Sequence, residues 1–256
     1  ESDGCFTPVY EEQYLSGAKV GIYAGEDIYT ADGTRRYEKD ELIETLETLS
    51  SGPVLTSELF EGVYYAKELS APAGYVLGDA EPVEVCLFSD DLSVGFSNQR
   101  QKCELKFVKC FDDGSTDFSA VTFGVFTASP ILDLPADSLL EVMQVDSSGK
   151  CTMTCDLPCG YDYYVRELTT ASGFAMSTAD LSFTFSPMSD DEEVFSVTFD
   201  PVVNYKMIVG GAASVASPDT GDDNGDAIRF YIITAVEALA LLVVVVVRKN
   251  KLTLYY

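Results

Sequence analysis

The chain repeats itself once, and this duplication constrains its fold more than any other feature. A tyrosine-rich segment at residues 64–75, Y-Y-A-K-E-L-S-A-P-A-G-Y, returns at residues 163–174 as Y-Y-V-R-E-L-T-T-A-S-G-F. Two further landmarks recur in the same order. Residues 20–23 match 123–126, and residues 96–98 match 202–204. Three landmarks in one order indicate two copies of one unit.

Each copy has the size of a small β-sandwich. Short alternating apolar runs are separated by Gly, Pro, Ser and Asp turns, as in antiparallel strands. We therefore predict an all-β fold with two tandem immunoglobulin-like sandwiches, at residues 1–99 and 100–207. The first sandwich is expected to lack its first strand. One helix is expected at residues 38–49, where Leu42, Ile43, Leu46 and Leu49 recur at helical spacing and would cover a sheet edge.

The last fifty residues predict a membrane signal. A spacer at 208–229 contains the pentapeptide S-P-D-T-G at 217–221, followed by an apolar run at 230–247 and a basic tail at 248–256. Eighteen helical residues rise roughly 27 Å, which is close to the hydrocarbon thickness of a bilayer. The basic tail would lie in the cytoplasm and everything before the span outside the cell.

Composition excludes several classes of function. The chain has no His, no phosphate-binding glycine loop and a net charge of -26. Histidine-dependent catalysis is therefore excluded, and the acidic field would repel nucleic acid. We expect no enzyme with turnover, no metal and no cofactor. The seven cysteines are expected to be small buried residues or to form one or two disulfides, rather than to bind metal.

Strand alternation predicts buried polar groups in both copies. Glu68 shares its face with Tyr64 and Ala66, and Glu167 lies at the matching position of the second copy. Asn98 falls on the face of Phe96, and Lys109 on that of Leu105 and Phe107. The remaining candidate is Asn204, which matches Asn98 in the repeat but is turned inward only if a bulge lies near Pro201.

Burial favours the neutral forms of Lys and Glu, and a neutral amine is a nucleophile. An amine held against an Asn side-chain amide, with a protonated Glu to polarise the carbonyl and move protons, can displace ammonia and form an amide crosslink. This reaction would run once, within the chain, without turnover.

The C-terminal order of pentapeptide, apolar span and basic tail resembles the sorting signal of Gram-positive surface proteins. This resemblance implies that a sortase cuts between Thr220 and Gly221 and joins Thr220 to a peptidoglycan precursor. Pro218 and Asp219 also fit the LPxTG-like pattern, whereas Ser217 replaces its Leu. A single-pass protein that keeps its helix is the alternative.

The sandwich copies resemble the Cna B-type, or SpaA-type, prealbumin-like domains of Gram-positive adhesins and pilins. The resemblance rests on the 64–75 segment, the first-strand Lys and the last-strand Asn. It implies an isopeptide bond between Lys109 and Asn204, with Glu167 as catalytic acid, and the partial set Glu68 and Asn98 in the first copy. That copy offers no first-strand Lys, since Lys19 falls in its second strand.

Together these resemblances imply a stalk segment of a wall-anchored adhesin at the cell surface. The chain would be the C-terminal part of a longer precursor, with an adhesive region before it. A wall-proximal pilin subunit is one alternative. Binding of host matrix protein or glycan by the two domains themselves is another, with Tyr65 and Tyr164 as exposed candidates because they alternate with the core face.

Overall fold

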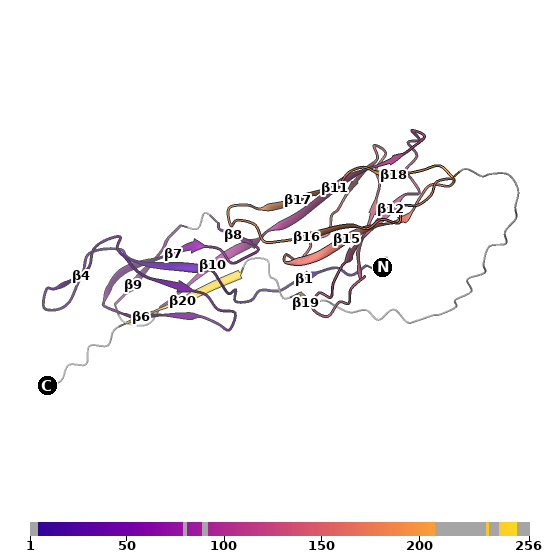
Figure 1. Ribbon diagram of the computed structural model, residues 1–256. Helices are drawn as coiled ribbons and strands as arrows, with labels where there is room; N and C mark the ends of the chain where they lie inside the picture. The colour runs from indigo at the N-terminus through magenta and orange to yellow at the C-terminus, as the bar shows by residue number, and fades with distance from the viewer. Residues whose placement is uncertain (1–4, 79–80, 89–91, 208–233, 236–240, 250–256) are drawn as a thin grey trace, which may run out of the picture. The chain divides into compact units, whose positions relative to one another are not determined.

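The described part of the chain is built from β-strands. The computed structural model describes residues 5–78, 81–88, 92–207, 234–235 and 241–249, and within them no helix occurs (Figure 1). The described residues form two compact units, of which one holds residues 9–102 and 186–195 with β19 and β20, and the other holds residues 5–8, 103–185 and 196–207. We call the unit built on residues 9–102 the first sandwich and the unit built on residues 103–185 and 196–207 the second. The all-β sandwich fold predicted from the sequence is confirmed.

The first sandwich contains two four-stranded sheets. One has the strand order β5-β2-β7-β9 and the other β6-β20-β10-β8, while β3 and β4 form a hairpin and β1 pairs with β19. The strands are β1 (Val9–Tyr10), β2 (Lys19–Ala24), β3 (Ile28–Tyr29), β4 (Arg35–Tyr37), β5 (Leu42–Glu47), β6 (Val54–Leu59), β7 (Gly62–Ser70), β8 (Tyr75–Val76), β9 (Val83–Leu87), β10 (Leu92–Arg100), β19 (Thr234–Ala235) and β20 (Leu241–Lys249).

The second sandwich repeats this plan. One sheet has the order β13-β12-β15-β16, and the other has β14-β11-β17, with β18 paired in parallel to β11. The strands are β11 (Lys102–Phe111), β12 (Thr122–Thr127), β13 (Leu139–Gln144), β14 (Lys150–Thr152), β15 (Tyr161–Thr169), β16 (Leu181–Phe185), β17 (Val194–Thr198) and β18 (Val202–Asn204).

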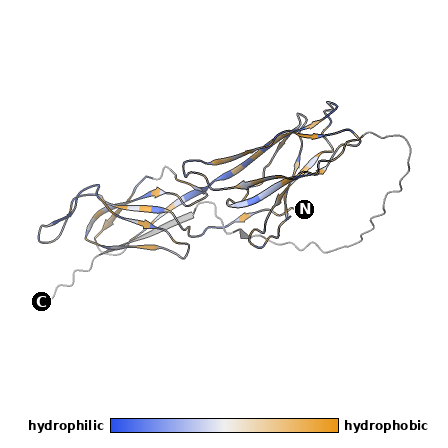
Figure 2. Ribbon diagram, in the orientation of Figure 1, coloured by the Kyte–Doolittle hydropathy of each residue, from blue (hydrophilic) through white to orange (hydrophobic). Residues whose placement is uncertain are grey.

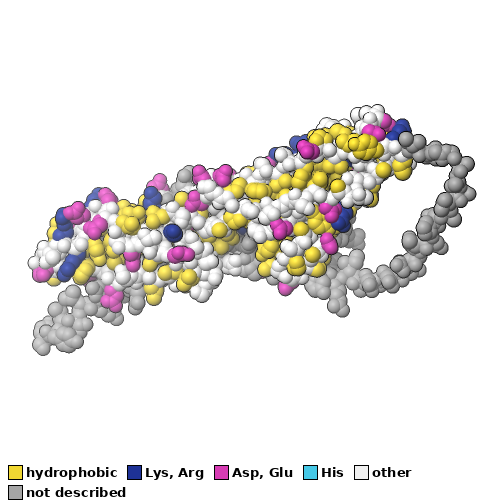
Figure 3. Space-filling view, in the orientation of Figure 1, with side chains coloured by type: hydrophobic (Ala, Val, Ile, Leu, Met, Phe, Trp, Pro, Cys, Tyr) yellow, Lys and Arg dark blue, Asp and Glu magenta, His cyan; other side chains and the backbone are white. Residues whose placement is uncertain are grey.

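Alternation along the strands builds the cores (Figure 2). Tyr64 and Ala66 on β7 are fully buried between Val20 and Ile22 of β2 and the apolar residues of β10. Full burial of one such side chain contributes about 1.5 to 3 kcal/mol, so these inward positions determine the register. Acidic side chains are spread over the outer surface in view (Figure 3), as the net charge of -26 requires.

The helix predicted at 38–49 is wrong, because this segment contains β5 instead. Its residues pair antiparallel with β2, and the register skips Ile43, which makes a β-bulge. The extra residue changes the alternation, so that Ile43 and Leu46 both pack against the core although they are three positions apart. Leu42 and Leu49 are 47% and 54% exposed. The bulge thus reproduces a helix-like spacing within a strand.

Half of the apolar run at 230–247 lies outside the described residues. Where it is described, β20 runs antiparallel to β10 and parallel to β6. Valine is β-branched, and a valine run in water favours strand pairing, whereas hydrocarbon favours a helix. Among the residues described, no helix is long and apolar enough to cross a membrane. The transmembrane helix therefore stays a prediction, as do the sorting pentapeptide at 217–221, which lies outside the described residues, and the basic tail, of which residues 250–256 lie outside them.

β20 and β11 occupy equivalent places in the two sheets. β20 lies between β6 and β10, as β11 lies between β14 and β17. Within the described part of residues 9–102, no strand takes this place, and the expectation that the first sandwich lacks its own first strand stays a prediction. The strand that carries Lys109 in the second sandwich therefore has no counterpart from the first repeat.

In each sandwich, a glycine at the same position of the repeat leaves room for two stacked aromatic rings on the outward face of a sheet. Phe126 stacks on Tyr164 with ring centroids 5.1 Å apart, and a Cβ added to Gly124 would lie 2.5 Å from the Phe126 ring. In the first sandwich, Tyr23 stacks on Tyr65 in the same way, and a Cβ on Gly21 would lie 2.7 Å from Tyr23.

We predict that Gly124→Ala destabilises the second sandwich by about 1 to 3 kcal/mol, because the added methyl group forces the ring pair to move. Urea unfolding followed by tyrosine fluorescence measures this change. Ser182→Ala, at an exposed position of the neighbouring strand β16, is the control and should change the unfolding free energy by less than about 0.5 kcal/mol. Equal stability of both variants and the wild type would contradict the proposed crowding.

Candidate functional site

Lys109 lies at the buried face of β11. Its side chain is inaccessible to solvent, and its position alternates with outward residues as the sequence predicts. The Nζ atom donates hydrogen bonds to the carbonyl oxygens of Cys110 at 3.0 Å and Val202 at 3.1 Å. A neutral amine has two N–H bonds and one lone pair, so these two acceptors leave the lone pair available.

Glu167 faces this amine from β15. Its side chain is also inaccessible, and its Oε1 atom lies 3.9 Å from Lys109 Nζ. The other carboxyl oxygen, Oε2, accepts a hydrogen bond of 2.6 Å from the backbone N–H of Ser177. The carboxyl group is therefore held at one oxygen and presents the other to the amine.

Asn204 completes the group from β18. Its Nδ2 atom donates to Glu167 Oε1 at 2.7 Å and to Thr170 Oγ1 at 2.6 Å. Its Oδ1 atom is buried without a hydrogen-bond partner. An unsatisfied buried carbonyl costs about 1 to 3 kcal/mol, so this amide is not in its most stable environment.

The inward position of Asn204 depends on a break before β18. On β17 the buried residue is Val197, which has an odd number. If the alternation continued unbroken, the even-numbered residues of β18 would face outward, but Val202 and Asn204 are buried. The phase changes across the irregular segment at Pro201, where the sequence required a bulge. Because β18 runs parallel to β11, Val202 lies opposite Lys109 and Asn204 opposite Phe111.

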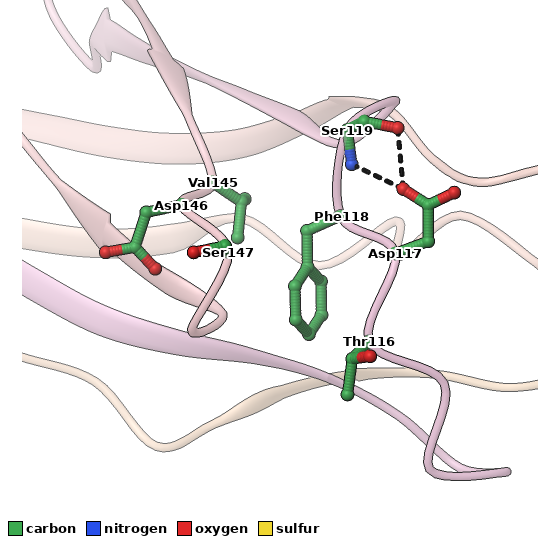
Figure 4. A pocket seen from close by; sticks show the side chains of 7 residues that line it. All are labelled: Thr116, Asp117, Phe118, Ser119, Val145, Asp146 and Ser147. Carbon is green, nitrogen blue, oxygen red and sulfur yellow. Dashed lines mark hydrogen bonds between the residues drawn. The ribbon is translucent and has the colours of Figure 1, made fainter.

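Aromatic rings surround the amine. Lys109 Nζ lies 5.1 Å from the ring centroid of Phe111, which packs against Phe174 at 4.2 Å and Phe118 at 5.4 Å. Phe118 also forms the floor of a surface pocket of about 210 Å³ between residues 116–119 and 145–147 (Figure 4). Burial among these groups lowers the pKa of the Lys109 amine, while the Glu167 carboxyl and Cys110 oppose this shift.

The first sandwich holds part of the same arrangement. Asn98 Nδ2 donates to Glu68 Oε1 at 2.7 Å, both residues are buried, and Asn98 Oδ1 has no partner. Burial raises the pKa of Glu68, and the hydrogen bond from Asn98 partly opposes this rise. Lys19 is exposed at the start of β2, and in the described part of the chain Glu68 has no ion-pair partner. This site thus has the acid and the amide without the amine.

Sequence reasoning identified the three buried groups but missed Thr170 and Ser177. Comparison of the two repeats gave one indication that Thr170 matters. It aligns with Ala71 just after the shared Glu-Leu pair, so a hydroxyl is present in one copy and absent from the other. Nothing in the sequence indicated that the backbone of Ser177 would reach Glu167, since this contact depends on the path of the loop after β15.

The aromatic side chains predicted to be exposed are largely covered. Tyr164 is only 5% exposed, stacks on Phe126 and donates its hydroxyl to Asp137 at 2.8 Å. The prediction that Tyr164 is exposed for ligand binding is therefore wrong, because the rings on the outward face of this sheet pack on each other over Gly124. Tyr65 is half-buried on Tyr23.

The predicted disulfides are absent from the cysteines whose state the structure defines. Cys86, Cys103, Cys110, Cys151 and Cys155 are thiols. Burial raises the pKa of Cys103 and of Cys151 to about 12, so both behave as small apolar residues of the core.

Comparison with known protein families finds one match, which lies in the first sandwich. Residues 9–100 match the model of the SpaA prealbumin-like fold domain. The second sandwich shares the strand plan of the first. A search of curated proteins finds no match.

Several solved structures are similar to the chain. The TIE protein of Bacillus anthracis is 18% identical with a TM-score of 0.45, over 78% of this chain and 33% of that protein. The chain thus spans about a third of its length. A C-terminal fragment of the pilus adhesin SpaC from Lactobacillus rhamnosus GG is 11% identical with a TM-score of 0.43, over 81% and 98% of the two chains. The shaft pilin SpaA of the same organism is 14% identical with a TM-score of 0.31, over 77% and 87%.

We predict that Glu68→Gln removes a pH-dependent loss of stability in the first sandwich. The folded-state pKa of Glu68 lies above its ordinary value of 4.5, so its contribution is complete below that pH and is lost as pH rises through the folded-state pKa. Glutamine keeps the acceptor for Asn98 but cannot ionise. The difference in melting temperature between Glu68→Gln and wild type should therefore increase in favour of the variant from pH 4.5 to pH 7.5.

Glu81→Gln, at an exposed carboxyl, is the control and should show no such trend. A difference that is constant with pH, or that moves in favour of wild type, would show that burial does not raise the pKa of Glu68.

Proposed function

We propose that the chain is a structural stalk segment of a bacterial surface protein, whose second sandwich crosslinks itself through an isopeptide bond between Lys109 and Asn204. The observation that carries this proposal is the meeting of an amine, a carboxyl and a carboxamide in one buried space. The groups come from three strands, β11, β15 and β18, which are far apart in the sequence. A solvated structural ion pair would not need this arrangement.

The reaction is a transamidation. The Lys109 lone pair attacks the side-chain carbonyl carbon of Asn204, a C–N bond forms, and ammonia leaves. Glu167 receives a proton from the amine and delivers it to the departing nitrogen, because its Oε1 lies between Lys109 Nζ and Asn204 Nδ2. Fixed positions replace a bimolecular encounter, an effect that can supply about 7 to 11 kcal/mol of the barrier. Each chain reacts once.

A crosslink at this place suits a load-bearing module. β11 opens the second sandwich and β18 closes it, so the bond would join strands near both ends of the folded unit. A pulling force applied at one end of the second sandwich would pass through the covalent bond and would not unfold the strands between β11 and β18. The bond would also close a loop of about 95 residues, for which loop-closure entropy gives roughly 4 to 5 kcal/mol of stabilisation.

The C-terminal signal supports attachment to the cell wall. On this proposal a sortase transfers Thr220 to a peptidoglycan precursor after transient membrane insertion, with the basic tail in the cytoplasm before cleavage. The two sandwiches would then lie outside the cell as the wall-proximal part of the protein. A wall-proximal pilin subunit would use the same modules and the same crosslink.

We predict that the full chain, expressed under reducing conditions, has a mass lower than calculated by one ammonia. Lys109→Ala and Glu167→Ala should have their full calculated masses, because one lacks the nucleophile and the other lacks the proton carrier. Intact-mass spectrometry makes this distinction.

Lys106→Ala is the matched control, since Lys106 lies on the same strand but is exposed and pairs with Glu104. It should lose ammonia like the wild type. Full calculated mass in the wild type would contradict crosslinking in the second sandwich.

Wall attachment makes a separate prediction. When the chain is exported in a sortase-bearing Gram-positive host, it should be recovered from the wall fraction only after the peptidoglycan is digested. Thr220→Ala should move it to the membrane fraction or the medium, and Ser214→Ala in the same spacer should not. Recovery of wild type from the membrane fraction alone would instead indicate a single-pass protein that keeps its span.

A further inference from the structure

Thr170 touches the amide that the proposed reaction consumes. It follows the last residue of β15, is half-buried, and places its hydroxyl 2.6 Å from Asn204 Nδ2. Glu167 Oε1 lies 2.7 Å from the same nitrogen. Two oxygens that can carry protons therefore flank one end of the carboxamide, whereas Oδ1 at its other end is buried without a partner.

Turning the carboxamide by half a turn exchanges its two ends with little change of shape. Oδ1 would then face the Thr170 hydroxyl and Glu167 Oε1. A hydroxyl donates as readily as it accepts, and a protonated carboxyl donates as well. This orientation gives Oδ1 two donors at the expense of the two acceptors that Nδ2 has in the structure. It is the orientation that the reaction needs if Lys109 attacks as an uncharged amine and Glu167 acts as an acid.

The position of the proton on Glu167 follows from Ser177. Its backbone N–H donates to Oε2, which must therefore act as an acceptor. When Glu167 is protonated, the proton resides on Oε1, the oxygen that faces Asn204. The loop after β15 thus directs the acidic proton toward the reacting amide.

We propose that the Thr170 hydroxyl is a catalytic donor that, with Glu167, stabilises the negative charge developing on Asn204 Oδ1 during crosslinking. This inference rests on the proposed function. As the Lys109 lone pair forms its bond to the amide carbon, the C=O electrons move onto Oδ1, where both donors hold them. The carbonyl then re-forms and the C–Nδ2 bond breaks as Glu167 gives its own proton to Nδ2 and takes in exchange the proton that Nζ releases, so that Nδ2 leaves as ammonia and Glu167 ends in the protonation state in which it began. Atoms and charge balance without another reactant.

The first sandwich provides an internal contrast. Ala71 takes the place of Thr170 in the repeat, and among the described residues Asn98 Nδ2 donates to Glu68 and to no hydroxyl at this position. The same fold therefore accepts alanine at this position. The hydroxyl is present in the sandwich that has the amine and is missing from the sandwich without it.

The test measures how fast newly made full-length chains lose ammonia. Chains are synthesised in a cell-free system, synthesis is stopped, and intact mass is followed with time. Thr170→Val and Thr170→Ala should crosslink about 10² to 10³-fold more slowly than wild type, the usual effect of removing one oxyanion donor. Thr170→Ser should stay within about tenfold of wild type because it keeps the hydroxyl.

Thr169→Val is the matched control. Thr169 is exposed, and its hydroxyl bonds to the Ala120 carbonyl at 2.7 Å and to Thr122, away from the amide. It should react at the wild-type rate. Slow reaction that still reaches completion in Thr170→Ala would show that the variant is folded and only its rate is affected.

Equal rates in wild type, Thr170→Val and Thr170→Ala would overturn the role of Thr170 and leave the crosslink intact. Failure of the wild type to lose ammonia would overturn the crosslink and this inference together. The two failures are therefore distinct.

Discussion

The burial of an amine beside a carboxyl and an amide governs the second sandwich. Polar groups buried away from water cost free energy unless they are hydrogen-bonded, and charged ones cost far more. Lys109 meets this demand with two backbone carbonyls and Glu167 with the Ser177 N–H. The acceptor of Asn204 remains unsatisfied. Such a set stores free energy in the folded state, and loss of ammonia would release it by turning three polar groups into an amide and a carboxyl.

Duplication with divergence explains why the two sandwiches differ. Both keep an acid and an amide 2.7 Å apart at matching positions. The second sandwich adds β11 with its lysine, and a hydroxyl at Thr170 where the first has Ala71. In the first sandwich the corresponding place in the sheet belongs to β20, from the far end of the chain. The acid–amide pair is thus common to both units, and within the described residues only the second unit combines it with an amine and a hydroxyl.

The repeat and the strand alternation predicted the sandwiches and the buried faces of Glu167 and Lys109, because period-two burial is a local property. The sequence-based predictions failed where the strand register departs from a period of two residues. A bulge at Ile43 made a strand look helical, and the break at Pro201 decided the direction of Asn204. Thr170 could not be predicted from β15 alone, since its role depends on a strand that is remote in sequence. Tyr164 was misjudged because Gly124 lets an outer ring pack flat.

A branched peptide would test the crosslink most directly. Trypsin cannot cut after a lysine whose amine is in an amide bond, so digestion should join residues 107–150, uncut at Lys109, to residues 167–206, which contain Asn204. Tandem mass spectrometry of the digested full chain should find this branched species, lighter by one ammonia than its two parts, with fragment ions placing the bond at Lys109 and Asn204. Recovery of residues 107–109 and 110–150 as separate linear peptides, with 167–206 at full mass, would contradict the account.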